Sequence, residues 1–245
     1  KLSRTLVSLQ FIMGAVVAGL AVKEIIEAAD AWLLMSSRLR LVTNNATQAA
    51  ALQQELVTLA NELRTPLKAT AELYTRLALN TQDLNLSQST MLGLTRAVGQ
   101  ALLLSGATAE EAAGGIIQFT QALAEGRLHG QELRSVMNQM PRLAKALADG
   151  LNETNPAFKA LTDGGMDANG ALRLWGATGK LVTAVTLPAL ISQFNKLDEG
   201  FAHLEKTSGQ AIQQLSNDFM ALVGEADISP LVQALTSLGA ALKDP

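Results

Sequence analysis

The sequence contains no cysteine and only two histidines, His129 and His203. Without cysteine the chain forms no disulfide, carries no thiolate nucleophile and builds no cysteine-ligated zinc site. Neither histidine belongs to an HExxH pair, so a helix-borne zinc hydrolase is unsupported. His129 stands between Gly126 and Gly130, and this spacing predicts a solvated residue of a turn.

Charged and aromatic residues are also scarce. Only 17% of residues are charged, the net charge is −3, and the aromatic residues are six Phe, two Trp and one Tyr. A chain of this charge has no broad basic face, so we expect no specific nucleic-acid site. Hydrophobic residues make up 48% of the chain and are dominated by alanine and leucine, which favours packed helices over β-strands.

A phosphate loop and paired catalytic carboxylates are both missing. The stretch Gly176 to Lys180 reads GATGK, but Leu174 stands where the first glycine of a Walker motif belongs, and Leu181 replaces its Ser or Thr. Glu110 is adjacent to Glu111, and Asp198 is adjacent to Glu199. Side chains of adjacent residues on a helix point in different directions, so neither pair can act on one substrate bond. The sequence therefore predicts no catalytic, cofactor-binding or metal-binding residue and no enzyme activity.

Helix starts and apolar stripes recur along the chain, and no stretch alternates as a strand does. Leu52, Leu56, Leu59 and Leu63 follow 4-3-4 spacing, which draws one stripe along a helix. A capping residue followed by proline marks three helix starts, at Thr65-Pro66, Asn155-Pro156 and Ser229-Pro230. The fold class is therefore predicted to be all-α, a multi-helix bundle with helix over most of residues 46–150 and 183–243.

Shorter signals place helix boundaries in the middle of the chain. Ser87 starts a helix that should stop at Gly106, and Gly126 ends the next one. Thr108 and Glu111 form a capping box, in which each side chain satisfies a backbone N–H at the start of that helix.

The first helix is unusually apolar. Residues Thr5 to Val22 are 18 residues without a charge, close to the shortest run that spans a bilayer. Gly14 and Ala18, like Ala15 and Gly19, fall four residues apart on one face, which lets two helices approach closely. We expect this face to mediate self-association or membrane contact. A soluble helix packed on its own chain or a sister copy, a segment that enters lipid, and a signal peptide remain open.

These signals divide the chain into four parts: an apolar N-terminal helix in residues 1–44, a helical core in 45–151, a glycine-rich irregular segment in 152–182, and C-terminal helices in 183–245. The third part carries five glycines between Gly164 and Gly179, and we expect loop there with at most a short helix or two. In the fourth, the apolar 4-3-4-3 spacing from Leu190 to Leu204 predicts a long helix packed on a neighbour. Because the chain begins with Lys1 and not Met, we expect a fragment of a longer protein.

Many segments, in order, resemble the tape-measure domain of tailed phages and prophages. The most specific are ALLLSGATAEEA (101–112) and QALAEGRLHGQEL (121–133). Others are found at 38–43, 64–67, 72–77, 135–136, 139–143, 146–151, 179–184 and 189–193. The sequence departs from the family pattern between Leu151 and Gly176 and at Pro188. The matching positions are caps, turns and apolar stripes, so the resemblance carries over no catalytic or ligand residue.

The resemblance implies a long helical protein of the virion tail lumen that sets tail length and leaves ahead of the DNA. Its implied partners are other copies of itself, tail tube and tail tip proteins, tail assembly chaperones and the host inner membrane during infection. The implied locations are the host cytoplasm during assembly and the cell envelope on infection. The alternative is a membrane-active pore or channel former that assists genome passage. A cell-wall hydrolase would need an acid pair or metal site, which the sequence does not show.

Overall fold

A computed structural model describes residues 22–106, 119–121 and 123–226. These parts of the chain confirm the all-α prediction, because they contain no strand beyond one isolated bridge between Arg127 and Val182. The helices of the first half are α2 (Val22–Leu39), α3 (Ala46–Leu63), α4 (Leu67–Asn80), the 3-10 turn η1 (Gln82–Leu84) and α5 (Gln88–Leu104). Those of the second half are α7 (Gly130–Gln139), α8 (Pro141–Thr154), α9 (Pro156–Asp163), α10 (Ala168–Ala177), α11 (Thr183–Ile191), α12 (Phe194–Ala202) and α13 (Ser208–Glu225).

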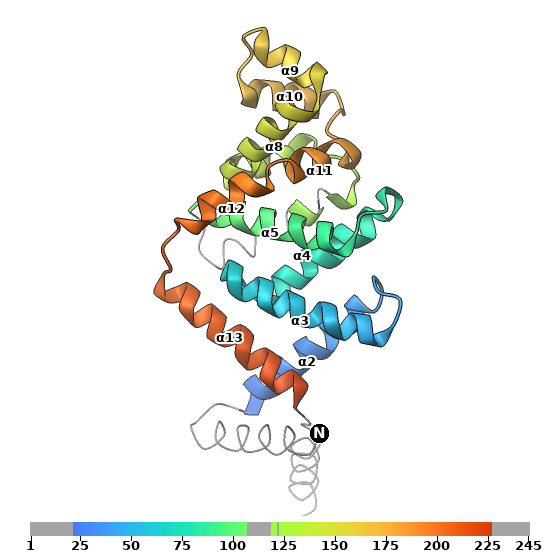
Figure 1. Ribbon diagram of the computed structural model, residues 1–245, viewed down its shortest axis with the longest axis vertical. Helices are drawn as coiled ribbons and strands as arrows, with labels where there is room; N and C mark the ends of the chain where they lie inside the picture. Colours follow the sequence, from blue (N-terminus) through green and yellow to red (C-terminus); the bar gives the residue numbers. More distant parts are fainter. Residues whose placement is uncertain (1–21, 107–118, 122, 227–245) are drawn as a thin grey trace, which may run out of the picture.

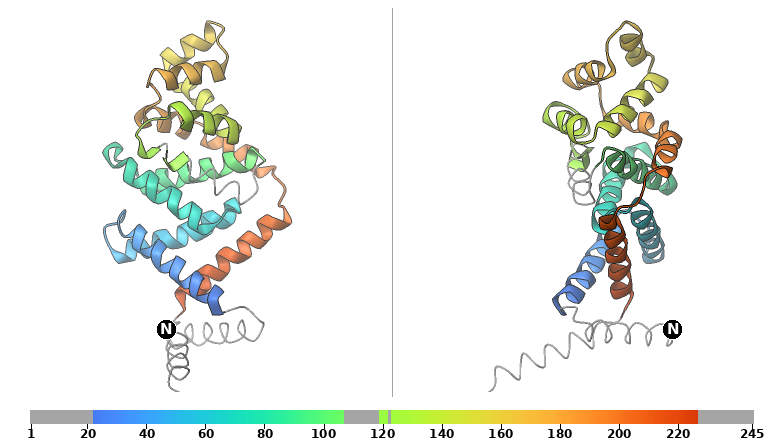
Figure 2. Two further views of the ribbon diagram at one scale, coloured as in Figure 1. Left: turned by 180° about the vertical axis from the view of Figure 1, so that it is seen from behind. Right: turned by 90° about the vertical axis from the view of Figure 1, so that its left-hand side faces the viewer.

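The helices stack along the long axis of an elongated body (Figures 1 and 2). The α9 and α10 pair forms one tip, and α2 and α13 form the opposite end, where the described chain both enters and leaves. A continuous apolar core runs from Trp32 in α2 to Leu197 in α12, and a small cluster of Ile25, Ala28, Ala29 and Val223 joins α2 to α13.

Two of the predicted helix starts are confirmed by their hydrogen bonds. The Ser87 hydroxyl accepts from the backbone N–H of Thr90 at the start of α5. The Asn155 side chain accepts from two N–H groups of α9, whose first residue is Pro156. The end of α5 is also as predicted, since Gly106 follows it with a φ of +84°, in the left-handed region. The predicted capping box at 108–111 and the start at 229–230 lie outside the described residues.

The start of α4 differs from the prediction. Pro66 stands one residue before the helix, and the Thr65 hydroxyl pairs with the Thr70 hydroxyl, not with a free backbone N–H. The cap instead comes from the distant Asn217 of α13: its side-chain oxygen accepts from the Leu67 N–H at 2.9 Å, and its NH₂ donates to the Thr65 carbonyl. One buried amide thereby satisfies both sides of the turn between α3 and α4.

Glycine permits the closest helix contacts. Gly150 of α8 lies against the Ala189 backbone of α11, where a Cβ would stand only 1.9 Å from the carbonyl oxygen. At the other end of the body, a Cβ on Gly224 of α13 would stand 2.0 Å from the indole of Trp32 in α2. These two contacts set the distance between the paired helices.

The segment predicted to be irregular is largely helical. It contains α9 and α10, joined by the turn at Gly164 and Gly165, and its helices carry well-formed asparagine and aspartate caps. The long helix predicted from the spacing of Leu190 to Leu204 is in turn divided between α11 and α12. Leu190 and Leu197 of its apolar spacing are buried, but α11 ends before Ser192 and α12 ends before His203, so no single helix carries the seam.

Candidate interaction surface

The sequence-predicted association face, Gly14, Ala15, Ala18 and Gly19, lies outside the described residues. The helical pattern that follows it is confirmed: α2 begins at Val22 and buries Ile25, Ala29 and Trp32. Leu33 of α2, by contrast, is 61% exposed, so this helix leaves part of its apolar surface open.

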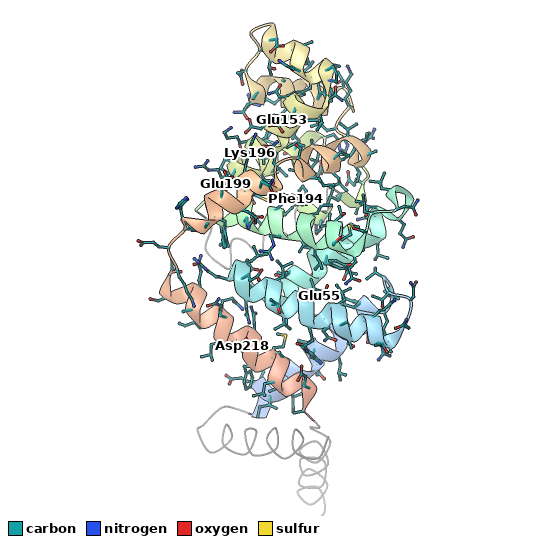
Figure 3. All side chains as sticks on the ribbon, in the orientation of Figure 1. Glu55, Glu153, Phe194, Lys196, Glu199 and Asp218 are labelled. Atoms are coloured by element: carbon teal, nitrogen blue, oxygen red, sulfur yellow. The ribbon has the colours of Figure 1, made fainter. Side chains whose placement is uncertain are left out.

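One face of α13 is bound to the body through polar contacts. Asp218 accepts a hydrogen bond from the Asn61 amide at 2.5 Å, and Glu225 accepts one from the Gln54 amide, both from α3 (Figure 3 labels Asp218). The Gln214 amide donates to the Asn61 carbonyl. The two acidic groups of this helix are therefore turned toward amide donors of the same chain.

Another face of α13 is apolar and only partly covered by the described chain, since Phe219 packs against the cluster that joins α2 to α13. Ile212 and Leu215 are 68% and 70% exposed, and Phe219 and Leu222 are half-buried. Their 3-4-3 spacing places the four side chains on one stripe, the pattern that packs against a second helix. We call these four residues the α13 stripe. Of the exposed residues that flank it, Ser208, Ala211 and Ser216 carry no charge, whereas Asp218 lies beside Leu215 and Leu222.

A shallow groove lies beside this end of the body, between α2 and α4. Its cavity of about 270 Å³ is lined by Glu27, Asp30, Ala31, Leu34, Met35, Arg38, Lys68, Ala71 and Thr75. Acidic side chains from the first half of α2 and basic ones from Arg38 and Lys68 share the lining, so no single charge sign dominates. Leu33 and Leu34 of α2 are exposed nearby, which adds apolar surface to this end of the molecule.

The adjacent carboxylates Asp198 and Glu199 do not point toward a common site. Asp198 accepts a hydrogen bond from the Gln100 amide at 2.6 Å, whereas Glu199 is exposed on α12 (Figure 3). Nearby, Lys196 donates to Glu153 at 2.5 Å. This bond lowers the pKa of the Glu153 carboxyl and raises the pKa of the Lys196 ammonium. The pair links α12 to α8 at the surface and has the geometry of a structural contact.

The GATGK stretch spans the end of α10 and the turn that follows it, and it is not a loop that leads into a helix as a phosphate loop does. Gly176 lies inside α10, where its missing side chain makes room for Leu133 of α7. Residues Glu110 and Glu111 lie outside the described part. Among the described helices, none combines the length and apolar character that crossing a membrane requires.

The sequence signals could have revealed the α13 stripe, because its 3-4-3 spacing is visible in the residue order. They do not reveal which side of the helix the body covers, since the covering residues are distant in the sequence: apolar residues of α2, and polar groups of α3 and α4.

Comparison with known proteins gives one match. The tape measure protein family matches residues 23–228, which is most of the chain and nearly all of the described body. No curated protein and no solved structure matches the chain. The family consists of structural phage tail proteins and is not a known enzyme family. The all-α body, with its apolar helix faces, agrees with this assignment, and the chain belongs to the tape measure protein family.

Proposed function

We propose that this protein sets the length of a phage tail during assembly and leaves the tail ahead of the DNA at infection. The observation that carries the proposal is the family match over residues 23–228. A helix rises about 1.5 Å per residue, so a helical chain converts residue number directly into length. A protein that sets length in this way needs no catalytic residues, and the charged pairs of the described body form structural contacts.

A deletion in the full-length protein tests directly whether it sets tail length. Removing n residues from a long helical region outside this body, in whole heptads, keeps the apolar seam in register and should shorten the tail by about 1.5n Å. Tail lengths are measured by electron microscopy of assembled particles. An equally long insertion serves as the control and should lengthen the tail. Tails of normal length after large in-register deletions would contradict the ruler and favour the membrane-active alternative.

We further propose that a second copy of this chain covers the α13 stripe. The stripe has the 3-4-3 spacing of a helix pair, and the exposure of Ile212 and Leu215 leaves its first half open to a second helix. The acidic groups beside the stripe, Asp218 and Glu225, already accept hydrogen bonds from side-chain amides of α3. Tail tube and tail tip proteins, the tail assembly chaperones and the host inner membrane remain proposed partners of the whole protein.

The test of the stripe is the oligomeric state of the chain by light scattering after size exclusion. Leu215→Asp should weaken self-association at least tenfold, because it puts a charge at the centre of the apolar contact. Leu174→Asp is the matched control, since Leu174 is an exposed leucine of α10 at the opposite tip. Equal association of parent and Leu215→Asp proteins would show that another surface joins the copies.

The N-terminal face needs a separate experiment. Replacing Gly14 and Ala18 by Leu should push paired helices apart and so weaken assembly or membrane insertion, whereas Val16→Leu should matter less. Oligomer size and liposome leakage are the measurements. If both are unchanged in the double variant, this face has no role in association or in lipid.

A further inference from the structure

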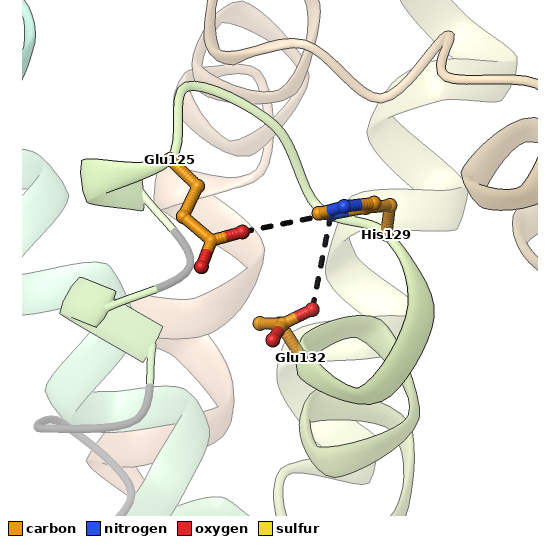
Figure 4. A group of neighbouring side chains, drawn as sticks. All are labelled: Glu125, His129 and Glu132. Carbon is orange, nitrogen blue, oxygen red and sulfur yellow. Dashed lines mark ion pairs between the residues drawn. The ribbon is translucent and has the colours of Figure 1, made fainter.

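Three potential ligand side chains meet where the chain turns into α7. Glu125 precedes the turn, His129 immediately precedes the helix, and Glu132 lies in its first turn (Figure 4). The Nδ1 atom of His129 is 3.8 Å from Oε2 of Glu125 and 3.8 Å from Oε2 of Glu132. One ligand atom from each residue lies within 4.8 Å of the other two.

The backbone holds this arrangement in place. Gly126 and Gly130 have φ values of +73° and +50°, which turn the chain sharply enough to bring Glu125 back toward α7. The turn is also fastened to the segment before α11, because the Leu128 N–H donates to the Leu181 carbonyl and the Thr183 N–H donates to the Gly126 carbonyl. The three side chains therefore converge on a fixed support.

The environment of His129 is not the solvated one expected from the sequence. Its side chain is 37% exposed, but the Nδ1 atom is buried and has no hydrogen-bond partner. A buried polar atom without a partner is costly. Here it faces two carboxylate oxygens, so three electron-pair donors surround one point and a cation is what they can share.

The spacing favours a metal ion over a bare proton. A hydrogen bond from a protonated imidazole to a carboxylate spans about 2.7 to 2.9 Å, well short of the 3.8 Å separations. Around tetrahedral Zn²⁺, with bonds of about 2.0 to 2.2 Å, neighbouring ligand atoms lie about 3.4 Å apart. Rotation of the two glutamate side chains would shorten the two 3.8 Å separations to this value and bring the carboxylate oxygens closer to each other.

We propose that Glu125, His129 and Glu132 bind a divalent transition-metal ion, with Zn²⁺ the best match to one imidazole and two carboxylates. Calcium and magnesium fit poorly because both prefer a shell made entirely of oxygen. The ion would join the residue before the Gly126 turn to the first turn of α7. It therefore acts as a structural cross-link, and water completes its coordination.

Isothermal titration calorimetry with Zn²⁺, on the whole chain after treatment with a chelator, tests the site. We expect one ion per chain and, at about one hundred times the dissociation constant, a melting temperature higher by about 5 to 10 °C. His129→Gln and Glu132→Gln should each weaken binding at least tenfold. His203→Gln is the matched control, because His203 is the only other histidine and is exposed immediately after α12. It should bind as the parent does.

Three results would overturn the proposal. These are no saturable Zn²⁺ binding by the parent chain, binding that survives both His129→Gln and Glu132→Gln, and equal affinity for Mg²⁺. Circular dichroism of the metal-free variants checks that each is folded. Substitution with Co²⁺ adds a direct readout, since its absorption bands should vanish in His129→Gln and persist in His203→Gln.

Discussion

Replacing Gly150 by alanine should destabilise the body, because Gly150 lies at the closest glycine contact between two described helices and leaves no room for a Cβ. The new Cβ would stand 1.9 Å from the Ala189 carbonyl oxygen and 2.5 Å from its carbon. Ordinary contact needs about 3.4 Å, so α11 must withdraw by about 1.5 Å. The obstacle is backbone and cannot rotate away. Leu187 and Leu190, buried in the same helix, would lose part of their packing.

Two opposing effects set the size of this change. Overpacking of a core costs about 1 to 3 kcal/mol, and the lost packing adds to it. Alanine in place of glycine within a helix returns about 1 kcal/mol. We expect a net loss of about 2 kcal/mol, which lowers the melting temperature of a chain this long by about 4 to 8 °C.

Thermal unfolding followed by far-ultraviolet circular dichroism measures the effect. Gly200→Ala is the matched control, because its Cβ would meet the Leu104 side chain at an ordinary 3.4 Å. This variant keeps the propensity gain without the clash and should melt about 2 to 4 °C higher than the parent. A Gly150→Ala protein that melts at or above the parent temperature would refute the close approach of α8 and α11.

Three further predictions concern single side chains. Asn217→Ala should lower the free energy of unfolding by about 2 kcal/mol in urea, because the buried Leu67 N–H loses its acceptor; an unchanged midpoint would argue against this cap. Burial, with the nearby charge of Glu55, raises the pKa of Tyr74 from 10.0 to about 12. Only the unfolded chain ionises between these values, so stability should be complete below pH 10 and decline up to pH 12, and the ultraviolet absorbance of this single tyrosine should titrate late. Asn155→Ala should cost about 1 kcal/mol by removing the cap of α9, and an equal urea midpoint would exclude that role.

Local signals in the sequence predicted the fold class and several helix ends, whereas long-range partners stayed hidden. Ser87 and Asn155 cap N–H groups only two or three residues away, so their role is visible in the residue order. The cap of α4 comes from Asn217, 150 residues along the chain from Leu67. No local pattern specifies such a partner, because its position depends on how α13 packs on α3.

Glycine explains why the segment expected to be loop with at most a short helix or two contains more helix than its composition suggests. Gly165, with a φ of +93°, does form a turn as expected. Gly176, however, lies within α10 against Leu133, where a Cβ would stand 2.3 Å from a methyl carbon. Glycine in this segment thus marks both turns and close packing, and a count of glycines does not distinguish the two.

The candidate site residues show the same limit. The spacing of Glu125, His129 and Glu132 is present in the sequence, but ordinary surface helices carry charges at similar intervals. Their convergence depends on positive φ values at Gly126 and Gly130 and on hydrogen bonds to the segment before α11. The face at Gly14 and Ala18 stays a prediction, since it lies outside the described residues.

The position of the chain ends has a consequence for the length that this body contributes. Ile25 near the start of α2 packs with Val223 near the end of α13, so the described chain leaves the body beside the point where it enters (Figure 1). Roughly 200 residues in one continuous helix would reach about 300 Å. Folded as described, these residues form a body that the chain enters and leaves at the same end. They therefore add almost nothing to the end-to-end length of the protein. If the protein sets tail length, residue number and distance are therefore proportional only outside this body. The body itself adds a constant contribution that does not depend on how many residues it contains.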